Sequence, residues 1–179
     1  MCGIVGYTGD QQAAPILLAG LEKLEYRGYD SAGLAVRDGE RVPEVVKAKG
    51  RLRALAEKTD NGRAMRGNCG IGHTRWATHG APSDENAHPQ MSTNGSICIV
   101  HNGIIENFLP LKEFLLKQGK TFRSETDTEV IANLLEYYYE QENDLMKAVR
   151  LTLGRIEGSY ALGILCATPL PKKLLTRLR

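Results

Sequence analysis

Cys2 follows the initiator Met1 directly and opens the stretch CGIVGY at residues 2–7. Because cysteine is small, Met1 can be removed, which would leave Cys2 with a free α-amine beside its own thiol. A free α-amine titrates with a pKa of about 7.7–8.0, close to neutral pH. A base fixed beside a soft nucleophile is an arrangement that attacks a carbonyl or a carboxamide. The alternative is that Cys2 is a small apolar residue at the start of a buried strand.

Four further residues could complete such a site. Arg75 leaves an apolar strand, where it either pairs with a surface carboxylate or clamps a substrate carboxylate. Asn102 and Gly103 are typical of a turn, but an amide and an N–H can also donate together to one oxyanion. Asp127 lies in the first turn of a predicted helix, where the helix dipole favours a carboxylate. Together with Arg75, it would also supply opposite charges for the two ends of an amino acid.

Hydrophobic periodicity predicts the elements that position these residues. The order places strands next to each other and groups several helices, which favours mixed or antiparallel sheets layered with helices. A capping box of Thr126 and Glu129 is expected to open one helix. A long polar loop at 81–95 is a candidate mobile segment over a site. Strands are expected at 4–7, 34–36, 42–46, 69–76, 97–100 and 159–166, and helices at 12–26, 52–58, 106–118, 126–138 and 145–153.

Composition excludes several classes of function. The 179 residues suit one domain, and the net charge of +2 without a basic run argues against a nucleic-acid partner. No segment approaches the length of a membrane span, and the start does not resemble a signal peptide, so we expect a cytoplasmic protein with no membrane partner. The four widely spaced cysteines indicate reduced thiols. Zinc and dinucleotide binding remain minor alternatives, because neither the histidine spacing nor Gly3-xx-Gly6-xx-Gly9 fits a known pattern.

As a set, these residues resemble the glutaminase domain of the class II glutamine amidotransferases, the N-terminal-nucleophile type. The resemblance covers roughly residues 2–166. The YRGYDSAG and HTRWATHG forms are similar to the branch of the glutamine–fructose-6-phosphate aminotransferases, also called glucosamine-6-phosphate synthases. The stretches that carry it are CGIVGY at 2–7, LEYRGYDSAG at 24–33, GHTRWATHG at 72–80, NAHP at 86–89, VHNGIIEN at 100–107 and SETDTEV at 124–130.

The resemblance implies a reaction and its residues. Cys2 would be the nucleophile with its own amine as general base, and Asn102 and Gly103 would form the oxyanion hole. Arg75 would hold the α-carboxylate of glutamine and Asp127 its α-ammonium group. Glutamate and ammonia would be released, with no metal and no cofactor. The other implied residues are Thr78 and His79 lining the pocket, Arg27 and Gly28 packed around the nucleophile, and Trp76 near the exit for ammonia.

The implied fold is α+β, a four-layer α/β/β/α sandwich of antiparallel sheets. Residues 2–166 would be an incomplete glutaminase domain, followed by an atypical tail at 167–179. Because Pro169 and Pro171 interrupt ladder pairing, we expect at most a short basic helix there. The strand at 159–166 would then keep an open edge, and the chain would be marginally stable and turn over glutamine weakly or not at all.

The resemblance also bears on partners. It implies glutamine as substrate, and sugar-isomerase domains, absent from these residues, that use the ammonia in the full-length enzyme; a homodimer is one arrangement open to that enzyme. Without those domains the chain is not expected to make glucosamine 6-phosphate. Two alternatives stay open. The chain could be the glutaminase domain of another class II amidotransferase, or a truncated, non-catalytic fragment that only folds or binds glutamine.

Overall fold

The computed structural model describes residues 2–77, 80–167 and 175–178. Strands and helices follow the order anticipated from the sequence, with three additions: a short 3-10 turn after the first helix, a two-residue strand at Gln90–Met91 and a strand at Leu175–Leu178. The elements are β1 Gly3–Thr8, α1 Ala13–Glu22, η1 Glu25–Arg27, β2 Ser31–Arg37, β3 Glu44–Lys49, α2 Leu52–Lys58, β4 Cys69–Arg75, β5 Gln90–Met91, β6 Ile97–Gly103, α3 Phe108–Lys117, α4 Asp127–Glu142, α5 Leu145–Arg155, β7 Tyr160–Cys166 and β8 Leu175–Leu178.

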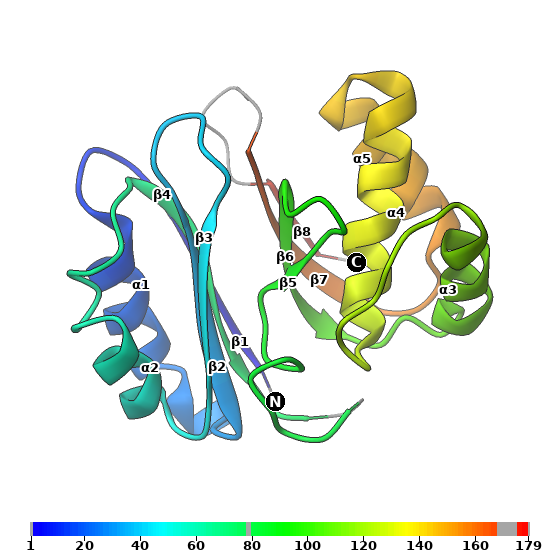
Figure 1. Cartoon of the computed structure of the whole chain (residues 1–179). Coiled ribbons are helices and arrows are strands. Elements are labelled where there is room, and N and C mark those ends of the chain that lie inside the picture. Colours follow the sequence, from blue (N-terminus) through cyan, green and yellow to red (C-terminus); the bar gives the residue numbers. More distant parts are fainter. Residues whose placement is uncertain (1, 78–79, 168–174, 179) are drawn as a thin grey trace.

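The strands form two antiparallel sheets that face each other. The first sheet has the order β1-β4-β2-β3 and the second the order β5-β6-β7-β8. Helices α1 and α2 cover the outer face of the first sheet, and α3, α4 and α5 lie outside the second (Figure 1). The arrangement is therefore a four-layer α/β/β/α sandwich, and the predicted fold class is confirmed.

Three apolar cores hold the four layers together. One lies between the first sheet and its helices and includes Leu17, Leu21 and Leu34. A second lies between the two sheets and includes Ile71 and Val100. The third packs the second sheet against α3, α4 and α5. Because a sheet that is buried on both faces needs apolar side chains on both, the central strands read as apolar on both faces.

The predicted turn at Asn102 and Gly103 is wrong. Strand β6 continues through both residues, which pair with Ala161 and Tyr160 of β7. Gly103 has φ 123°, and an added Cβ would lie 2.1 Å from the Ser159 carbonyl oxygen. Gly103 is therefore required here by its positive φ and by close strand packing, and not by a local turn. Pairing with a distant strand overrides the local turn signal.

The predicted capping box is also replaced. Thr126 is the N-cap of α4, but its side chain makes no capping bond. The Glu129 carboxylate instead accepts from the backbone N–H groups of Arg123 and Ser124, at 2.8 and 2.6 Å, and from the Ser124 hydroxyl at 2.7 Å. The Glu129 carboxylate is thus bonded to Arg123 and Ser124 in place of the backbone N–H of Thr126. It fixes the segment that precedes the helix.

The predicted helix in the tail is wrong as well. Leu175–Leu178 forms β8 and pairs antiparallel with β7, from Ala161 to Ile164. The edge of β7 offers a row of backbone donors and acceptors, whereas a helix of a few residues is barely stable. Pro169 and Pro171 lie outside the described residues. Because β7 has a neighbour on each side, the open edge expected there is wrong too, and with it the reason given for marginal stability and weak turnover.

No helix in the described part of the chain is long and apolar enough to cross a membrane. The loop expected at 81–95 contains β5, where Gln90 and Met91 pair with Ile99 and Cys98 of β6.

Candidate functional site

Cys2 lies where the ends of three strands meet. It precedes β1, whose Gly3 pairs with Thr74 of β4, so the chain after β4 runs beside it. The backbone N–H of Trp76 donates to the Cys2 Sγ at 3.2 Å, and the Sγ lies 3.5 Å from the Trp76 carbonyl oxygen. The Nδ2 of Asn102, near the end of β6, donates to the Cys2 carbonyl oxygen at 3.2 Å. The fold thus brings a thiol and an amide donor together from positions 100 residues apart.

Arg75 is the buried cation of this site. Arg75 is the last residue of β4 and is only 3% exposed. Its Nη2 donates to the Gly80 carbonyl oxygen at 3.1 Å. Burial lowers the pKa of Arg75 below its usual value, while Asp30, Cys2 and Asp127 act in the opposite direction. Those groups are close enough to act on the guanidinium, so Arg75 faces the same region as Cys2 and Asp127.

Asp127 opens α4 and is 4% exposed. Its Oδ2 accepts from the Ile105 backbone N–H at 2.9 Å, and its Oδ1 lies 3.9 Å from the His101 Nδ1. The positive end of the helix dipole also favours a carboxylate at this position. The carboxylate is therefore held in a fixed place.

Asp30 holds the segment that carries Arg75 and Trp76, and sequence reasoning did not single it out. Its Oδ2 accepts from the Ala77 backbone N–H, and its backbone N–H donates to the Arg75 carbonyl oxygen at 3.2 Å. The available signal was its place in the motif YRGYDSAG.

Gly28 packs directly against the segment that holds the thiol. A Cβ added to Gly28 would lie 2.8 Å from the Arg75 carbonyl carbon and 3.1 Å from the Trp76 backbone nitrogen. Arg27 is the last residue of η1, immediately before it. Trp76 is 48% exposed and meets the Tyr29 ring edge-on at 5.4 Å between centroids. The expectations for Thr78 and His79 lie outside the described residues.

Three buried histidines sit behind the site. The Nε2 of His73 lies 2.9 Å from the Asn102 Oδ1, and the Nδ1 of His101 lies 2.9 Å from the Thr128 hydroxyl. The rings of His73 and His88 are 4.4 Å apart. Burial lowers the pKa of His73 to about 3, so this ring is neutral at neutral pH. Sequence alternation placed His73 on the face of Arg75 but did not indicate contact with Asn102.

These histidines do not form a metal centre. The described residues contain no group of three or more His, Cys, Asp or Glu side chains arranged to hold a metal ion.

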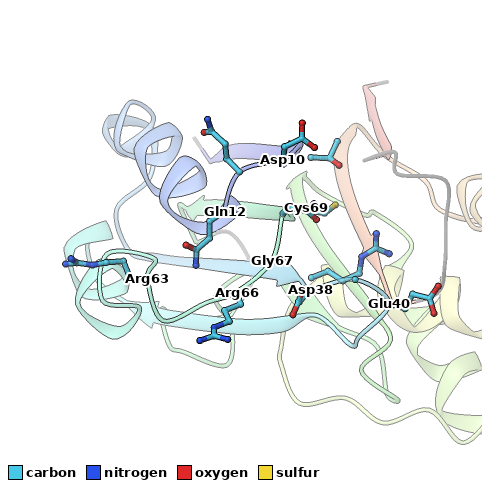
Figure 2. A pocket seen from close by; sticks show the side chains of 13 residues that line it. Asp10, Gln12, Asp38, Glu40, Arg63, Arg66, Gly67 and Cys69 are labelled. Carbon is cyan, nitrogen blue, oxygen red and sulfur yellow. The ribbon is translucent and has the colours of Figure 1, made fainter.

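The hollow in Figure 2 lies elsewhere. It has a volume of about 840 Å³ and is lined by both acidic and basic side chains, among them Asp38, Glu40 and Arg66. Thr8 and Cys69, at the opposite ends of β1 and β4 from Cys2, also line it. Because strands rise about 3.3 Å per residue, the end of β1 that lines the hollow is about 20 Å from the cysteine. It is separate from the site described above.

A four-layer antiparallel sandwich with a cysteine immediately before β1 defines a protein of the N-terminal-nucleophile amidotransferase class. The sequence profile described as "Glutamine amidotransferase domain" matches residues 47–166. The chain therefore belongs to the glutamine amidotransferase domain family.

Curated relatives agree with this assignment. The chain is 62% identical over 166 residues to the "Glutamine--fructose-6-phosphate aminotransferase [isomerizing]" of Caldanaerobacter subterraneus subsp. tengcongensis. It is 56% identical over 167 residues to the protein of that name from Clostridium tetani. Each match covers 93% of this chain and 27% of the relative, so the chain spans about a quarter of the relatives' length.

A solved structure agrees as well. Glutamine phosphoribosylpyrophosphate amidotransferase from B. subtilis superimposes with a TM-score of 0.79 at 28% identity, over 93% of this chain and 35% of that one.

Proposed function

We propose that this chain hydrolyses the side-chain amide of glutamine, with Cys2 as nucleophile after Met1 is removed. The observation that carries the proposal is the hydrogen bond from the Asn102 Nδ2 to the Cys2 carbonyl oxygen, at 3.2 Å, which places an amide donor at the residue that carries the thiol, beside the buried Arg75. A nucleophile, an oxyanion donor and a charge for an amino-acid end are the parts that acyl transfer from glutamine needs. The relatives' names, which include glutamine and aminotransferase, support the same reaction.

The proposed reaction requires only residues of this chain, glutamine and water. The α-amine of Cys2 takes the thiol proton, and the sulfur forms a bond to the carboxamide carbon. The carboxamide oxygen becomes an oxyanion, to which the Asn102 NH₂ group and the Gly103 N–H donate. Collapse breaks the carbon–nitrogen bond, and the protonated amine gives its proton to the departing ammonia. Water then cleaves the γ-glutamyl thioester, which releases glutamate and restores the thiol.

Two charged side chains are proposed to recognise the α-carboxylate and α-ammonium groups of glutamine. In this proposal, Arg75 binds the α-carboxylate through its planar guanidinium, and Asp127 binds the α-ammonium group. Both are at most 4% exposed, so their charges are little screened by water. Thr78 and His79 line the pocket, Arg27 and Gly28 pack around the nucleophile, and Trp76 lies near the exit of ammonia.

The wider role is proposed from the relatives. In a longer protein, the ammonia would pass to sugar-isomerase domains that make glucosamine 6-phosphate from fructose 6-phosphate, in amino-sugar biosynthesis in the cytoplasm. Residues 2–166 would be the glutaminase domain and 167–179 its tail. A homodimer of that longer protein is consistent with the proposal.

Glutamate release from glutamine, with the intact mass recorded on the same sample, tests the proposal. We expect activity only in chains that have lost Met1, because a retained Met1 turns the Cys2 amine into an amide nitrogen. Cys2→Ala should abolish turnover, whereas Cys69→Ala, at the far end of the β1–β4 pair, should retain it. A sample that keeps Met1 and hydrolyses glutamine at the full rate would rule out the α-amine as base. No glutamate from the processed chain would rule out the function.

A further inference from the structure

A buried histidine of one sheet reaches the proposed oxyanion residue of the other. His73 lies on β4 in the first sheet and is 0% exposed. Its Nε2 lies 2.9 Å from the Asn102 Oδ1 and 3.1 Å from the His101 backbone oxygen, both on β6 in the second sheet. These contacts cross the interface between the sheets next to Cys2.

The backbone fixes which ring nitrogen carries the proton. A carbonyl oxygen such as that of His101 can only accept, so the His73 Nε2 must be the donor. At neutral pH this ring is neutral and carries a single proton, because burial lowers the pKa of His73 to about 3. The Asn102 atom that faces the Nε2 must then be the amide oxygen.

The contact of Asn102 with Cys2 independently indicates the same orientation of the amide. The Cys2 carbonyl oxygen, 3.2 Å from the Asn102 side chain, can only accept, so the NH₂ group must face Cys2. The two contacts together exclude the flipped amide. Asn102 is therefore held with its donor group toward the nucleophile before any substrate binds.

We infer that His73 is a positioning residue that holds the Asn102 amide with its NH₂ group directed at the oxyanion formed on Cys2. The inference deepens the proposed glutaminase function and rests on it. The terminal torsion of an asparagine side chain is soft, so without a fixed donor the amide can turn its oxygen toward the reaction centre. A donor that is already oriented stabilises the oxyanion without a cost of reorganisation during the reaction.

The ring of His73 also has a buried nitrogen whose hydrogen-bonding capacity is unused in the part of the chain that the structure describes. Its Nδ1 is buried and has no hydrogen-bond partner among the described residues. A buried polar atom without a partner costs free energy, and the neighbouring core of Ile71 and Val100 would accept an apolar side chain. A polar ring kept at such a position is expected where the ring serves the site.

Glutaminase kinetics of two substitutions test the inference. His73→Leu removes the donor, and we expect kcat to fall at least tenfold while KM stays within threefold, because Arg75 and Asp127 bind the far end of glutamine. His73→Gln keeps an N–H donor at a similar reach and should recover most of kcat. His88→Gln is the matched control, since its ring lies 4.4 Å from that of His73 in the same buried cluster. It should leave kcat within threefold.

A thermodynamic cycle separates positioning from a merely structural role. If His73 acts through Asn102, adding His73→Leu to Asn102→Ala should change kcat by less than twofold. The same tenfold loss in both backgrounds would overturn the inference. So would a loss in KM alone, or an equal loss in His88→Gln.

Binding of a glutamine analogue with an aldehyde in place of the carboxamide gives a second readout. The thiol adds to the aldehyde carbon and its proton ends on the aldehyde oxygen, which occupies the place of the oxyanion. His73→Leu should weaken this analogue at least tenfold and glutamate less than threefold. If the unsubstituted chain neither hydrolyses glutamine nor binds the analogue, the proposed function and the inference both fail. If it does both and His73→Leu matches it, the inference alone fails.

Discussion

The Trp76 backbone N–H donates to the Cys2 Sγ at 3.2 Å, so the peptide that follows β4 holds the proposed nucleophile. Gly28 packs against that same peptide, and no side chain fits between them. A Cβ at position 28 would lie 2.8 Å from the Arg75 carbonyl carbon, closer than real Cβ atoms come to backbone. The position of the thiol therefore depends on the glycine that follows η1.

Gly28→Ala should displace the peptide after β4 and with it the thiol. We expect kcat/KM for glutamine to fall at least tenfold, or about 1.4 kcal/mol of transition-state stabilisation, in a protein that remains folded by circular dichroism. Gly154→Ala is the control, because nothing lies within 4 Å of a Cβ at that position of α5. It should leave turnover unchanged and raise stability by up to about 1 kcal/mol. Equal kinetics in both variants would contradict the packing argument.

Arg75→Lys should weaken glutamine use more than tenfold in kcat/KM. A lysine keeps the charge but offers a point donor in place of a planar pair of N–H groups, so the α-carboxylate loses a bidentate partner. Asp127→Asn should have a similar effect at the ammonium end of the substrate. Steady-state glutamate release measures both.

Glutaramide serves as the substrate control, since it lacks both the α-carboxylate and the α-ammonium group. The unsubstituted chain should hydrolyse it far more slowly than glutamine, and Arg75→Lys and Asp127→Asn should scarcely alter that slow rate. If glutaramide were used as well as glutamine, both recognition roles would be lost.

Much of the fold could be predicted because its signals are local. Apolar alternation and helical spacing located all the longer elements, and the helix at Leu52–Lys58 has the predicted bounds. The tail could not be predicted in this way, since the pairing of Leu175–Leu178 depends on β7 and not on its own sequence. The same holds for Asn102 and Gly103, where the partner strand overrides a turn signal.

The sequence named residues for the candidate site but not the contacts between them. Motif resemblance named Cys2, Arg75 and Asp127 but gave no role to His73. The bond between His73 and Asn102 joins two sheets across 29 residues, and neither periodicity nor spacing reports which side chains meet there. The close approach of Gly28 to the Arg75 peptide is likewise a property of the folded chain alone.

Stability should fall as the pH falls below about 6.5. Burial lowers the pKa of His73 to about 3 and that of His88 well below its usual value. The charged groups that act on them are Arg75 on both and Lys47 on His88, besides the neighbouring His101. Between pH 6.5 and pH 3 these histidines bind protons in the unfolded chain but not in the folded chain. Their contribution to the free energy of unfolding is therefore complete above pH 6.5 and is lost as the pH falls toward 3.

For two histidines, this loss amounts to about 2–3 kcal/mol of unfolding free energy between pH 7.5 and pH 5.5. Urea unfolding at a series of pH values measures it. His88→Gln removes one of the two titrating rings and should reduce the pH dependence by about half. A variant with the same dependence as the unsubstituted chain would refute the assignment to these rings.

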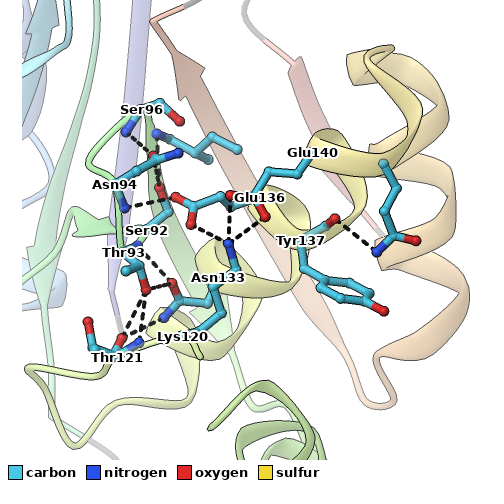
Figure 3. A network of polar contacts seen from close by, with 12 residues as sticks. Ser92, Thr93, Asn94, Ser96, Lys120, Thr121, Asn133, Glu136, Tyr137 and Glu140 are labelled. Atoms are coloured by element: carbon cyan, nitrogen blue, oxygen red, sulfur yellow. Dashed lines mark hydrogen bonds and ion pairs between the residues drawn. The ribbon is translucent and has the colours of Figure 1, made fainter. Parts of the chain in front are cut away.

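Lys120 anchors a polar network between α4 and two loops (Figure 3). Its Nζ lies 2.7 Å from the Glu136 Oε1 and 2.7 Å from the Glu140 Oε2. The other oxygen of Glu136 accepts from the Asn94 backbone N–H at 3.0 Å. The Lys120 and Glu136 side chains are 8% and 2% exposed, so this ion pair is little screened by solvent. Glu140 is half exposed and contributes less.

Lys120→Met should lower the free energy of unfolding by about 3 kcal/mol, because it leaves the Glu136 carboxylate buried without a cation. For a chain of this size, that loss corresponds to about 6–12 °C in Tm. Burial acts to lower the pKa of Lys120, but the bonds to Glu136 and Glu140 together outweigh it and raise the pKa above its usual 10.5. The contribution of the pair to stability is therefore complete at neutral pH and is lost only as the pH rises through the raised value.

Lys117→Met makes the same chemical change at an exposed lysine of α3 and should alter stability by no more than about 0.5 kcal/mol. Adding Glu136→Gln to Lys120→Met removes the stranded charge and should recover part of the loss, which thermal and urea unfolding of all four proteins would measure. Should Lys120→Met be no less stable than Lys117→Met, the buried pair would contribute nothing to the fold.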